Sequence, residues 1–212
     1  MWDKRIRDAL DGPLRRAAAR IDVPWLSPNR LTGAGLVLGL ASAAAAATQL
    51  WWVSLALWLA SRAGDGLDGP LARRREAQAL RHSDVAPSRA GGFLDVMADF
   101  TVYGSTVVGV AVGATSGEGA TWLPFLCVLL AYYVNGAACL AFSSITERTG
   151  RCRDDGRSLT FPAGVAEGAE TIVVHSLWLV LPQFSGVIAS VWAAVVGVSA
   201  AHRVAAGYLA LR

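Results

Sequence analysis

Six apolar segments divide this chain of 212 residues, and each is about as long as a lipid bilayer is thick. They cover roughly residues 31–49, 50–70, 93–113, 121–142, 165–183 and 186–210. Because lipid offers no hydrogen bonds to an exposed backbone, such segments can span a membrane only as helices. The sequence therefore predicts an all-α membrane protein with six transmembrane helices.

Residues 1–27 precede the first apolar segment and are rich in basic side chains. Their apolar residues recur at intervals of three and four, at Ile6, Leu10, Leu14, Ala17 and Ile21. This pattern is typical of an amphipathic helix that lies on an anionic membrane surface. We therefore predict a single domain over residues 1–212, in which an interfacial N-terminal arm precedes a six-helix bundle over residues 28–212.

The 19 Lys and Arg residues are distributed unevenly along the chain. The connections after the first, third and fifth apolar segments contain none of them. They lie instead in the arm, in the connections after the second and fourth segments, at the C-terminus and at the adjoining segment ends. Because basic residues are retained on the cytoplasmic side of a membrane, both termini and the connection after the second segment should face the cytoplasm. The pattern indicates a multi-pass protein of the cell (plasma or inner) membrane.

Two pairs of aspartates stand at the cytoplasmic ends of the second and third segments. Asp65 and Asp68 are three residues apart, and Asp95 and Asp99 are four apart, so on a helix each pair shares one face. Ionised groups at membrane depth are costly unless they are paired or bind a metal. Two such faces brought together make a cage of oxygen atoms, which suits a hard divalent cation such as Mg²⁺ or Mn²⁺.

A small ion transporter, with the paired acids as its translocation site, is the alternative from another class of protein. A transporter places its acids near the bilayer midplane, between inverted repeats. Here the acids stand at the ends of the segments and the sequence shows no repeat. This arrangement favours an enzyme.

The run from Asp65 to Asp99 resembles the signature of the CDP-alcohol phosphotransferase family. That signature reads D-x2-D-G-x2-A-R followed by G-x3-D-x3-D, and the chain has every fixed residue in order. One difference lies between the two halves, where residues 74–90 stand in place of the family's usual stretch of about eight. We expect these additional residues, which are basic and include Pro87, to enlarge a cytoplasmic loop without taking part in catalysis.

The resemblance implies transfer of a phosphatidyl group from CDP-diacylglycerol to the hydroxyl of a small alcohol, with release of CMP. It also implies two divalent ions, Mg²⁺ or Mn²⁺, held by Asp65, Asp68, Asp95 and Asp99. Asp99 would act in addition as the general base, which requires close contact with the acceptor hydroxyl, because a carboxylate beside a metal has a depressed pKa. A homodimer surrounded by membrane lipids is expected, and nucleic acid is not an expected partner.

The resemblance further implies a set of residues around the donor. They are Asn29, Thr32, Gly69, Ala72, Arg73 and Gly91. A bidentate arginine suits a diphosphate, although a positive side chain at the cytoplasmic membrane surface explains Arg73 as well. For Asn29 and Thr32, capping of the first transmembrane helix is the alternative role.

The acceptor is expected near the connection between the fourth and fifth segments. The residues predicted to bind it are Arg153, Arg157, Glu167 and Glu170. Because arginines hold phosphate and carboxylates hold hydroxyls, the set favours a phosphorylated polyol, glycerol 3-phosphate or an inositol phosphate. Serine, choline or inositol remain open as acceptors, as does a CDP-aminoalcohol donor with a lipid acceptor. A plain cytoplasmic basic loop would also account for the arginines.

Overall fold

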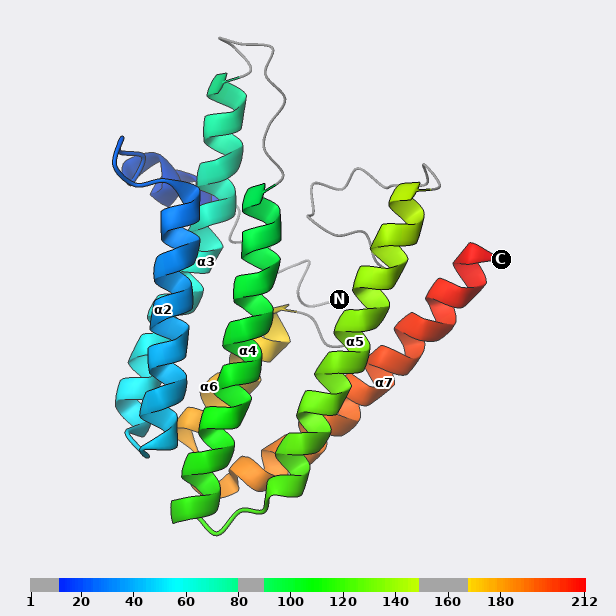
Figure 1. Cartoon of the computed structure of the whole chain (residues 1–212). Helices are drawn as coiled ribbons and strands as arrows, with labels where there is room; N and C mark the ends of the chain where they lie inside the picture. The colour runs from blue at the N-terminus through cyan, green and yellow to red at the C-terminus, as the bar shows by residue number, and fades with distance from the viewer. Residues whose placement is uncertain (1–11, 80–89, 149–167) are drawn as a thin grey trace. The chain divides into compact units, whose positions relative to one another are not determined.

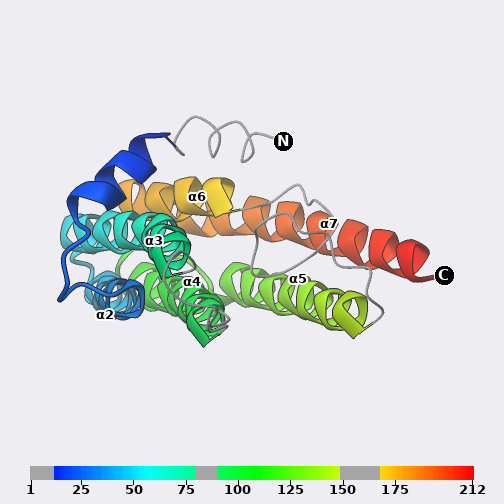
Figure 2. The same ribbon diagram turned by 90° about the horizontal axis from the view of Figure 1, so that it is seen from above.

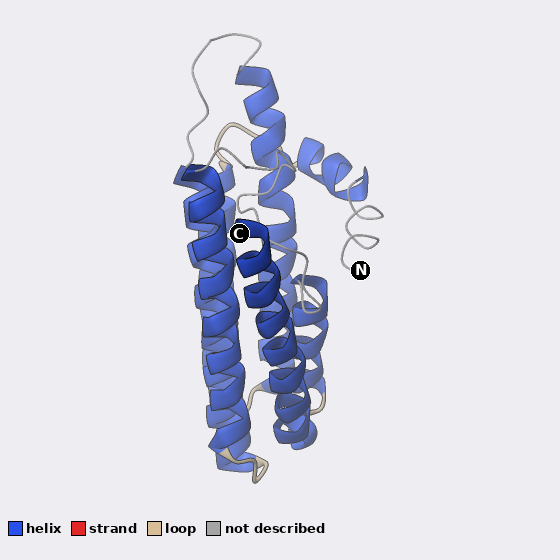
Figure 3. Cartoon of the chain, turned by 90° about the vertical axis from the view of Figure 1, so that its right-hand side faces the viewer, coloured by secondary structure: helices blue, strands red, loops and turns tan. Residues whose placement is uncertain are grey.

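The computed structural model describes residues 12–79, 90–148 and 168–212, and within these ranges every regular element is helical (Figure 3). A short helix over residues 12–20 comes first. The elements that follow are α2 (Pro28–Ala47), α3 (Trp51–Ala79), α4 (Ala90–Gly117), α5 (Trp122–Arg148), α6 (Gly168–Val180), the 3₁₀ helix η1 (Pro182–Phe184) and α7 (Ser185–Leu211). The chain forms two compact units, Met1–Gly109 and Val110–Arg212, and their boundary falls within α4.

Four of these elements are long and apolar enough to cross a membrane. They are α2, α4, α5 and the continuous stretch formed by η1 and α7. Large apolar side chains such as Val37 and Trp52 are 65% and 71% exposed, as expected where lipid takes the place of water. The all-helical membrane fold thus agrees with the sequence, while the total of six transmembrane helices stays a prediction.

Two further helices, α3 and α6, differ from these four in charge and in length. α3 is 29 residues long, but its second half carries the aspartates and a run of arginines. It continues well past Pro70, at which the predicted transmembrane segment ends. The part of α6 that the structure describes is apolar and 13 residues long. Residues 165–167, with which the fifth segment was predicted to begin, lie outside the described ranges.

In the first unit, small residues bring α2, α3 and α4 side by side (Figures 1 and 2). Ser42 of α2 and Ser54 of α3 each donate a hydrogen bond of 2.8 Å to the other's backbone carbonyl. Gly109 of α4 meets the backbone of Ala43, and a Cβ at this position would clash with the Ala43 carbonyl. This close approach of backbones is characteristic of helices packed within a membrane.

The helix over residues 12–20 belongs to the first unit and packs on α3. Ala18 is buried, and Leu14 lies 3.8 Å from the position that a Cβ of Gly66 would occupy on α3. Arg16 and Arg20 are exposed, so the helix has an apolar and a basic side. The first 11 residues of the predicted arm lie outside the described ranges, and placement of the arm on a membrane surface stays a prediction.

The second unit is built mainly on the pair α5 and α7, which lie side by side in Figures 1 and 2. The Tyr132 hydroxyl on α5 accepts a 2.7 Å hydrogen bond from Trp192 Nε1 on α7 and lies 2.9 Å from His175 Nε2 on α6. Arg203 of α7 donates a 3.0 Å hydrogen bond to Asn135 of α5. These polar side chains therefore tie the helices of the unit together.

Candidate metal centre

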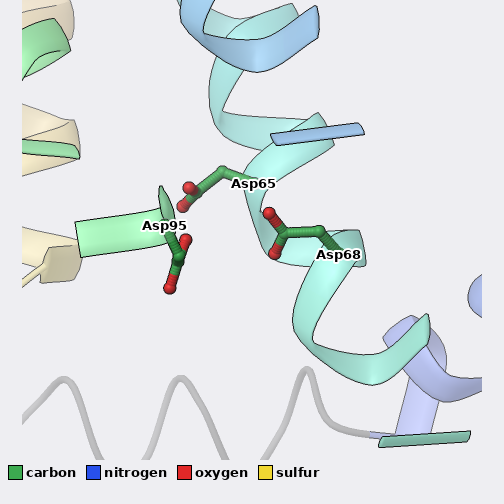
Figure 4. Close-up of side chains that lie close together, drawn as sticks. All are labelled: Asp65, Asp68 and Asp95. Atoms are coloured by element: carbon green, nitrogen blue, oxygen red, sulfur yellow. The ribbon is translucent and has the colours of Figure 1, made fainter. Parts of the chain in front are cut away.

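Asp65 and Asp68 lie one helical turn apart on α3, and Asp95 lies in the second turn of α4. The three carboxylates point toward one another, as Figure 4 shows. Each can offer one oxygen such that all three oxygens lie within 4.8 Å of one another. We call these three residues the aspartate cluster. The predicted meeting of the two halves of the motif is thus present in the structure.

The chemistry of the aspartate cluster fits a divalent cation. Its ligand atoms are all carboxylate oxygens, which Mg²⁺ and Mn²⁺ prefer. Asp68 is only 6% exposed, and the other two carboxylates are half-buried. Because three negative charges at this separation repel one another where water is scarce, a bound cation would stabilise the arrangement.

Thr32 makes a contact with the aspartate cluster that the sequence analysis did not predict. Its hydroxyl donates a 2.5 Å hydrogen bond to Asp68 Oδ2, which joins α2 to the aspartate cluster. The N-cap of α2 is Ser27, whose side chain accepts a hydrogen bond from the Arg30 backbone. Thr32 therefore orients a candidate metal ligand and is not the helix cap. Its contact with the donor stays a prediction.

The other predicted donor residues form two small groups. Asn29 Oδ1 of α2 lies 3.2 Å from the position of a Cβ at Gly91, near the start of α4. On α3, the exposed Arg73 folds back so that its Nη1 lies 3.4 Å from the position of a Cβ at Gly69. Ala72 beside it is exposed. Glycine at 69 and 91 leaves room for these two polar side chains.

Asp99 is separate from the aspartate cluster. Its Oδ1 accepts a 2.7 Å hydrogen bond from Arg62 Nη1, and the same nitrogen lies 3.6 Å from Asp65 Oδ2. Asp99 therefore has an arginine as its partner, one helical turn along α4 from Asp95. Its predicted roles as a metal ligand and as the general base stay predictions.

Arg62 is the site residue that the sequence analysis missed. It lies on α3 one turn before Asp65, and it is only 7% exposed. Its guanidinium lies close to the rings of Trp58 and Tyr103. A signal was available, because an arginine inside an apolar segment is rare and is generally paired with an acid.

A second missed contact lies at the end of α3 beyond the signature. Arg74 and Arg75 donate hydrogen bonds of 2.9 and 3.0 Å to the two carboxylate oxygens of Asp22. These hydrogen bonds lower the pKa of Asp22 below its ordinary value. They attach the end of the arm to the last turns of α3, where the residues predicted to enlarge the loop are still helical.

Of the predicted acceptor residues, the structure describes one. Glu170 lies in the first turn of α6, in the second unit. Arg153, Arg157 and Glu167 lie outside the described residues, as do positions 80–89 of the enlarged loop. The role of all four predicted acceptor residues stays a prediction.

The chain is similar in sequence to proteins of one known family. A model of the CDP-alcohol phosphatidyltransferase family matches residues 25–199. The inner membrane protein YnjF of Escherichia coli K12 is 29% identical over an alignment of 217 residues, which covers 100% of this chain and 98% of that protein. Phosphatidylcholine synthase of Mesorhizobium japonicum is 29% identical over 110 residues, or 47% of this chain and 35% of that protein.

Solved structures with a similar fold include phosphatidylinositol phosphate synthase of Mycobacterium tuberculosis, crystallised with CDP-DAG bound and in complex with manganese and citrate. Both superpose with a TM-score of 0.67 over 92% of this chain, at 17% identity, and cover 92% and 88% of the solved chains. At this identity the likeness concerns the fold. With its complete signature and a family match over residues 25–199, this chain belongs to the CDP-alcohol phosphatidyltransferase family.

Proposed function

We propose that the protein transfers the phosphatidyl group of CDP-diacylglycerol to the hydroxyl of a small alcohol and releases CMP. The observation that carries the proposal is the aspartate cluster, in which the two halves of the family signature meet. The solved relative of M. tuberculosis, which was crystallised with CDP-DAG bound, supports the choice of donor. Membership of a transferase family also argues against the ion transporter considered from the sequence.

In this proposal the aspartate cluster holds the divalent cation, and Asp99 is the further protein ligand that a second ion would need. The resemblance predicts two ions, and Mg²⁺ or Mn²⁺ bound there would neutralise the diphosphate oxygens and the charge that develops in the transition state. Thr32 fixes the carboxylate of Asp68 through its hydrogen bond. A carboxylate held in this way keeps one orientation toward its ligand.

Asp99 serves the acceptor. It takes the proton of the attacking hydroxyl, whose oxygen forms a bond to the phosphorus atom that carries the diacylglycerol. The bond between that phosphorus and the bridging oxygen breaks, and the oxygen leaves as part of CMP. The hydrogen bond from Arg62 uses Oδ1 of Asp99, so the second carboxylate oxygen remains for the proton.

The proposed donor residues surround this centre from α2, α3 and α4. Arg73 is exposed, and its guanidinium can bind the diphosphate through two parallel hydrogen bonds. Asn29 and Gly91 lie together where α2 and α4 begin, and they would contact the nucleotide part of the donor. Gly69 and Ala72, two small residues of the signature, would let the donor approach the backbone of α3.

We propose a phosphorylated polyol, glycerol 3-phosphate or an inositol phosphate, as the acceptor. Arg153 and Arg157 would bind its phosphate, and Glu167 and Glu170 its hydroxyls. The solved relative in M. tuberculosis is a phosphatidylinositol phosphate synthase, which supports an acceptor of this kind. Choline is the second candidate, because phosphatidylcholine synthase matches about half of this chain.

The acceptor can be identified from the lipid product. Purified protein is incubated with CDP-diacylglycerol, Mn²⁺ and one alcohol at a time, and the lipids are analysed by mass spectrometry. The panel contains glycerol 3-phosphate, inositol phosphate, inositol, serine and choline. We expect a new phospholipid only with a phosphorylated polyol. A product with choline or serine alone would contradict the proposed phosphorylated acceptor while supporting the transferase activity. In a separate reaction, the protein is given a CDP-aminoalcohol and diacylglycerol. We expect no phospholipid there, and a product would show that the site uses a CDP-aminoalcohol as donor and a lipid as acceptor.

A further inference from the structure

Arg62 sits in a pocket made by two aromatic rings. Its guanidinium carbon lies 5.2 Å from the centre of the Trp58 ring and 5.1 Å from that of Tyr103. The two rings meet edge to face, with centroids 5.9 Å apart. Trp58 is one turn before Arg62 on α3, and Tyr103 is one turn after Asp99 on α4. Aromatic faces attract a cation, so the rings fix the guanidinium between the two helices.

Both terminal nitrogens of the guanidinium are bonded. Nη1 donates to Asp99 Oδ1 at 2.7 Å, and Nη2 donates to Ser61 Oγ at 3.1 Å. The Ser61 hydroxyl donates in turn to the Gly35 carbonyl of α2 at 2.7 Å. The arginine is thus tied to all three helices that surround the aspartate cluster, and its position leaves little freedom to move away from Asp99.

This arrangement sets Arg62 in competition with a metal ion. A divalent ion bound to Asp99 would come within a few ångströms of a positive guanidinium, and two cations at that distance repel strongly where water is scarce. The aspartate cluster is affected less, because its closest contact with Arg62 is the longer ion pair with Asp65, at 3.6 Å against 2.7 Å for Asp99. The two expected ion positions are therefore unequal before any substrate is present.

We propose that Arg62 is a positioning residue that keeps divalent ions away from Asp99 until the donor binds. Without donor, the protein binds one divalent ion, at the aspartate cluster. The second ion binds at Asp99 only together with the diphosphate of the CDP-alcohol. The diphosphate adds negative charge that offsets the repulsion between the cations, and it offers new acceptors to the guanidinium. The entry of the second ion with the donor rests on the proposed function. The binding of a single ion by the donor-free protein does not depend on that function.

The test counts Mn²⁺ ions bound to the purified full-length protein, by electron paramagnetic resonance of the free ion. Without donor, wild type should bind about one ion per chain, and Arg62→Gln about two, because the competing cation is gone. Arg62→Lys keeps the charge and should stay at about one. Arg212→Gln is the matched control, since Arg212 also lies over an aromatic ring, 5.6 Å from the centre of Tyr208, and should leave the count unchanged.

The double variant Arg62→Gln/Asp99→Asn identifies the second position. It should return to about one ion, because the additional ion needs Asp99 as a ligand. A purely structural role of Arg62 predicts the reverse, a loss of Mn²⁺ in Arg62→Gln. That loss in a folded protein, or about two ions in donor-free wild type, overturns the proposal.

Addition of CDP-diacylglycerol to wild type should raise the count from about one to about two, and Asp99→Asn should prevent the rise. This comparison needs only wild type and Asp99→Asn, so it still tests the proposal if Arg62→Gln does not fold. A count that stays at about one in a wild-type protein that releases CMP would contradict the entry of the second ion with the donor. A protein that releases no CMP would contradict the proposed function instead, and the donor-free counts would still decide the role of Arg62.

Discussion

Thr32 shows how one hydroxyl can control a metal ligand from a neighbouring helix. We expect Thr32→Val, which removes the hydrogen bond to Asp68 but keeps the shape, to weaken Mn²⁺ binding about ten- to a hundredfold. Thr32→Ser keeps the hydroxyl and should bind Mn²⁺ nearly as wild type does. Isothermal titration of the donor-free protein measures both. Equal affinities of the two variants would contradict a positioning role for the hydroxyl.

The sequence predicts some contacts of the site much better than others. Asp65 and Asp68 share a face because both belong to one helix, and their spacing alone fixes this. The contacts of Thr32 with Asp68 and of Arg62 with Asp99 join residues 36 and 37 positions apart. Those pairs depend on the rotation of neighbouring helices about their axes, which no local pattern specifies.

At the scale of helices, Gly109 of α4 lies directly against the backbone of α2 at Ala43. Gly109→Ala places a methyl group against the Ala43 backbone, which cannot move as a flexible side chain could. We expect a loss of about 1–3 kcal/mol in stability from such overpacking. Gly104→Ala on the same helix is the control: a Cβ there meets nothing within 4 Å, so alanine should be neutral or stabilising. Thermal unfolding in detergent tests the pair.

The attachment of the arm should depend on pH. Arg74 and Arg75 lower the pKa of Asp22, so their hydrogen bonds to it contribute fully above its unfolded-state pKa and are lost as the pH falls through the lowered value. A spin label at position 16, in a neutral detergent, should be restrained at about pH 6 and become mobile once the pH falls below the lowered pKa of Asp22. Asp22→Asn should leave the label mobile at both. A label in this variant that is as restrained as in wild type would show that Asp22 does not hold the arm.

The sequence identifies the apolar helices but not the full length of α3. The apolar runs of α2, α4, α5 and α7 identify those elements, because length and hydropathy are local properties. In α3 the apolar run stops near Pro70, yet the helix continues to Ala79. Arginine, glutamate, alanine and glutamine favour helices in water, so this part is a polar extension of the helix that a search for membrane segments does not detect.

For the whole molecule, the distribution of basic residues predicts the orientation in the membrane. In a variant without its three native cysteines, a cysteine at the exposed Ser116, just before the end of α4, should react with an impermeant reagent in intact cells. A cysteine at the exposed Arg148, where α5 ends, should react only after the membrane is permeabilised. The opposite pattern would reverse the orientation and place the aspartate cluster outside the cell.

The measurement that tests the account most directly is CMP release from CDP-diacylglycerol by the purified protein, in the presence of a phosphorylated polyol. Mn²⁺ or Mg²⁺ should support the release, an excess of chelator should stop it, and added Mn²⁺ should restore it. Asp65→Asn should reduce the rate by several orders of magnitude, because the ligands of the aspartate cluster act together. Undiminished CMP release in excess chelator, or from Asp65→Asn, would contradict the account.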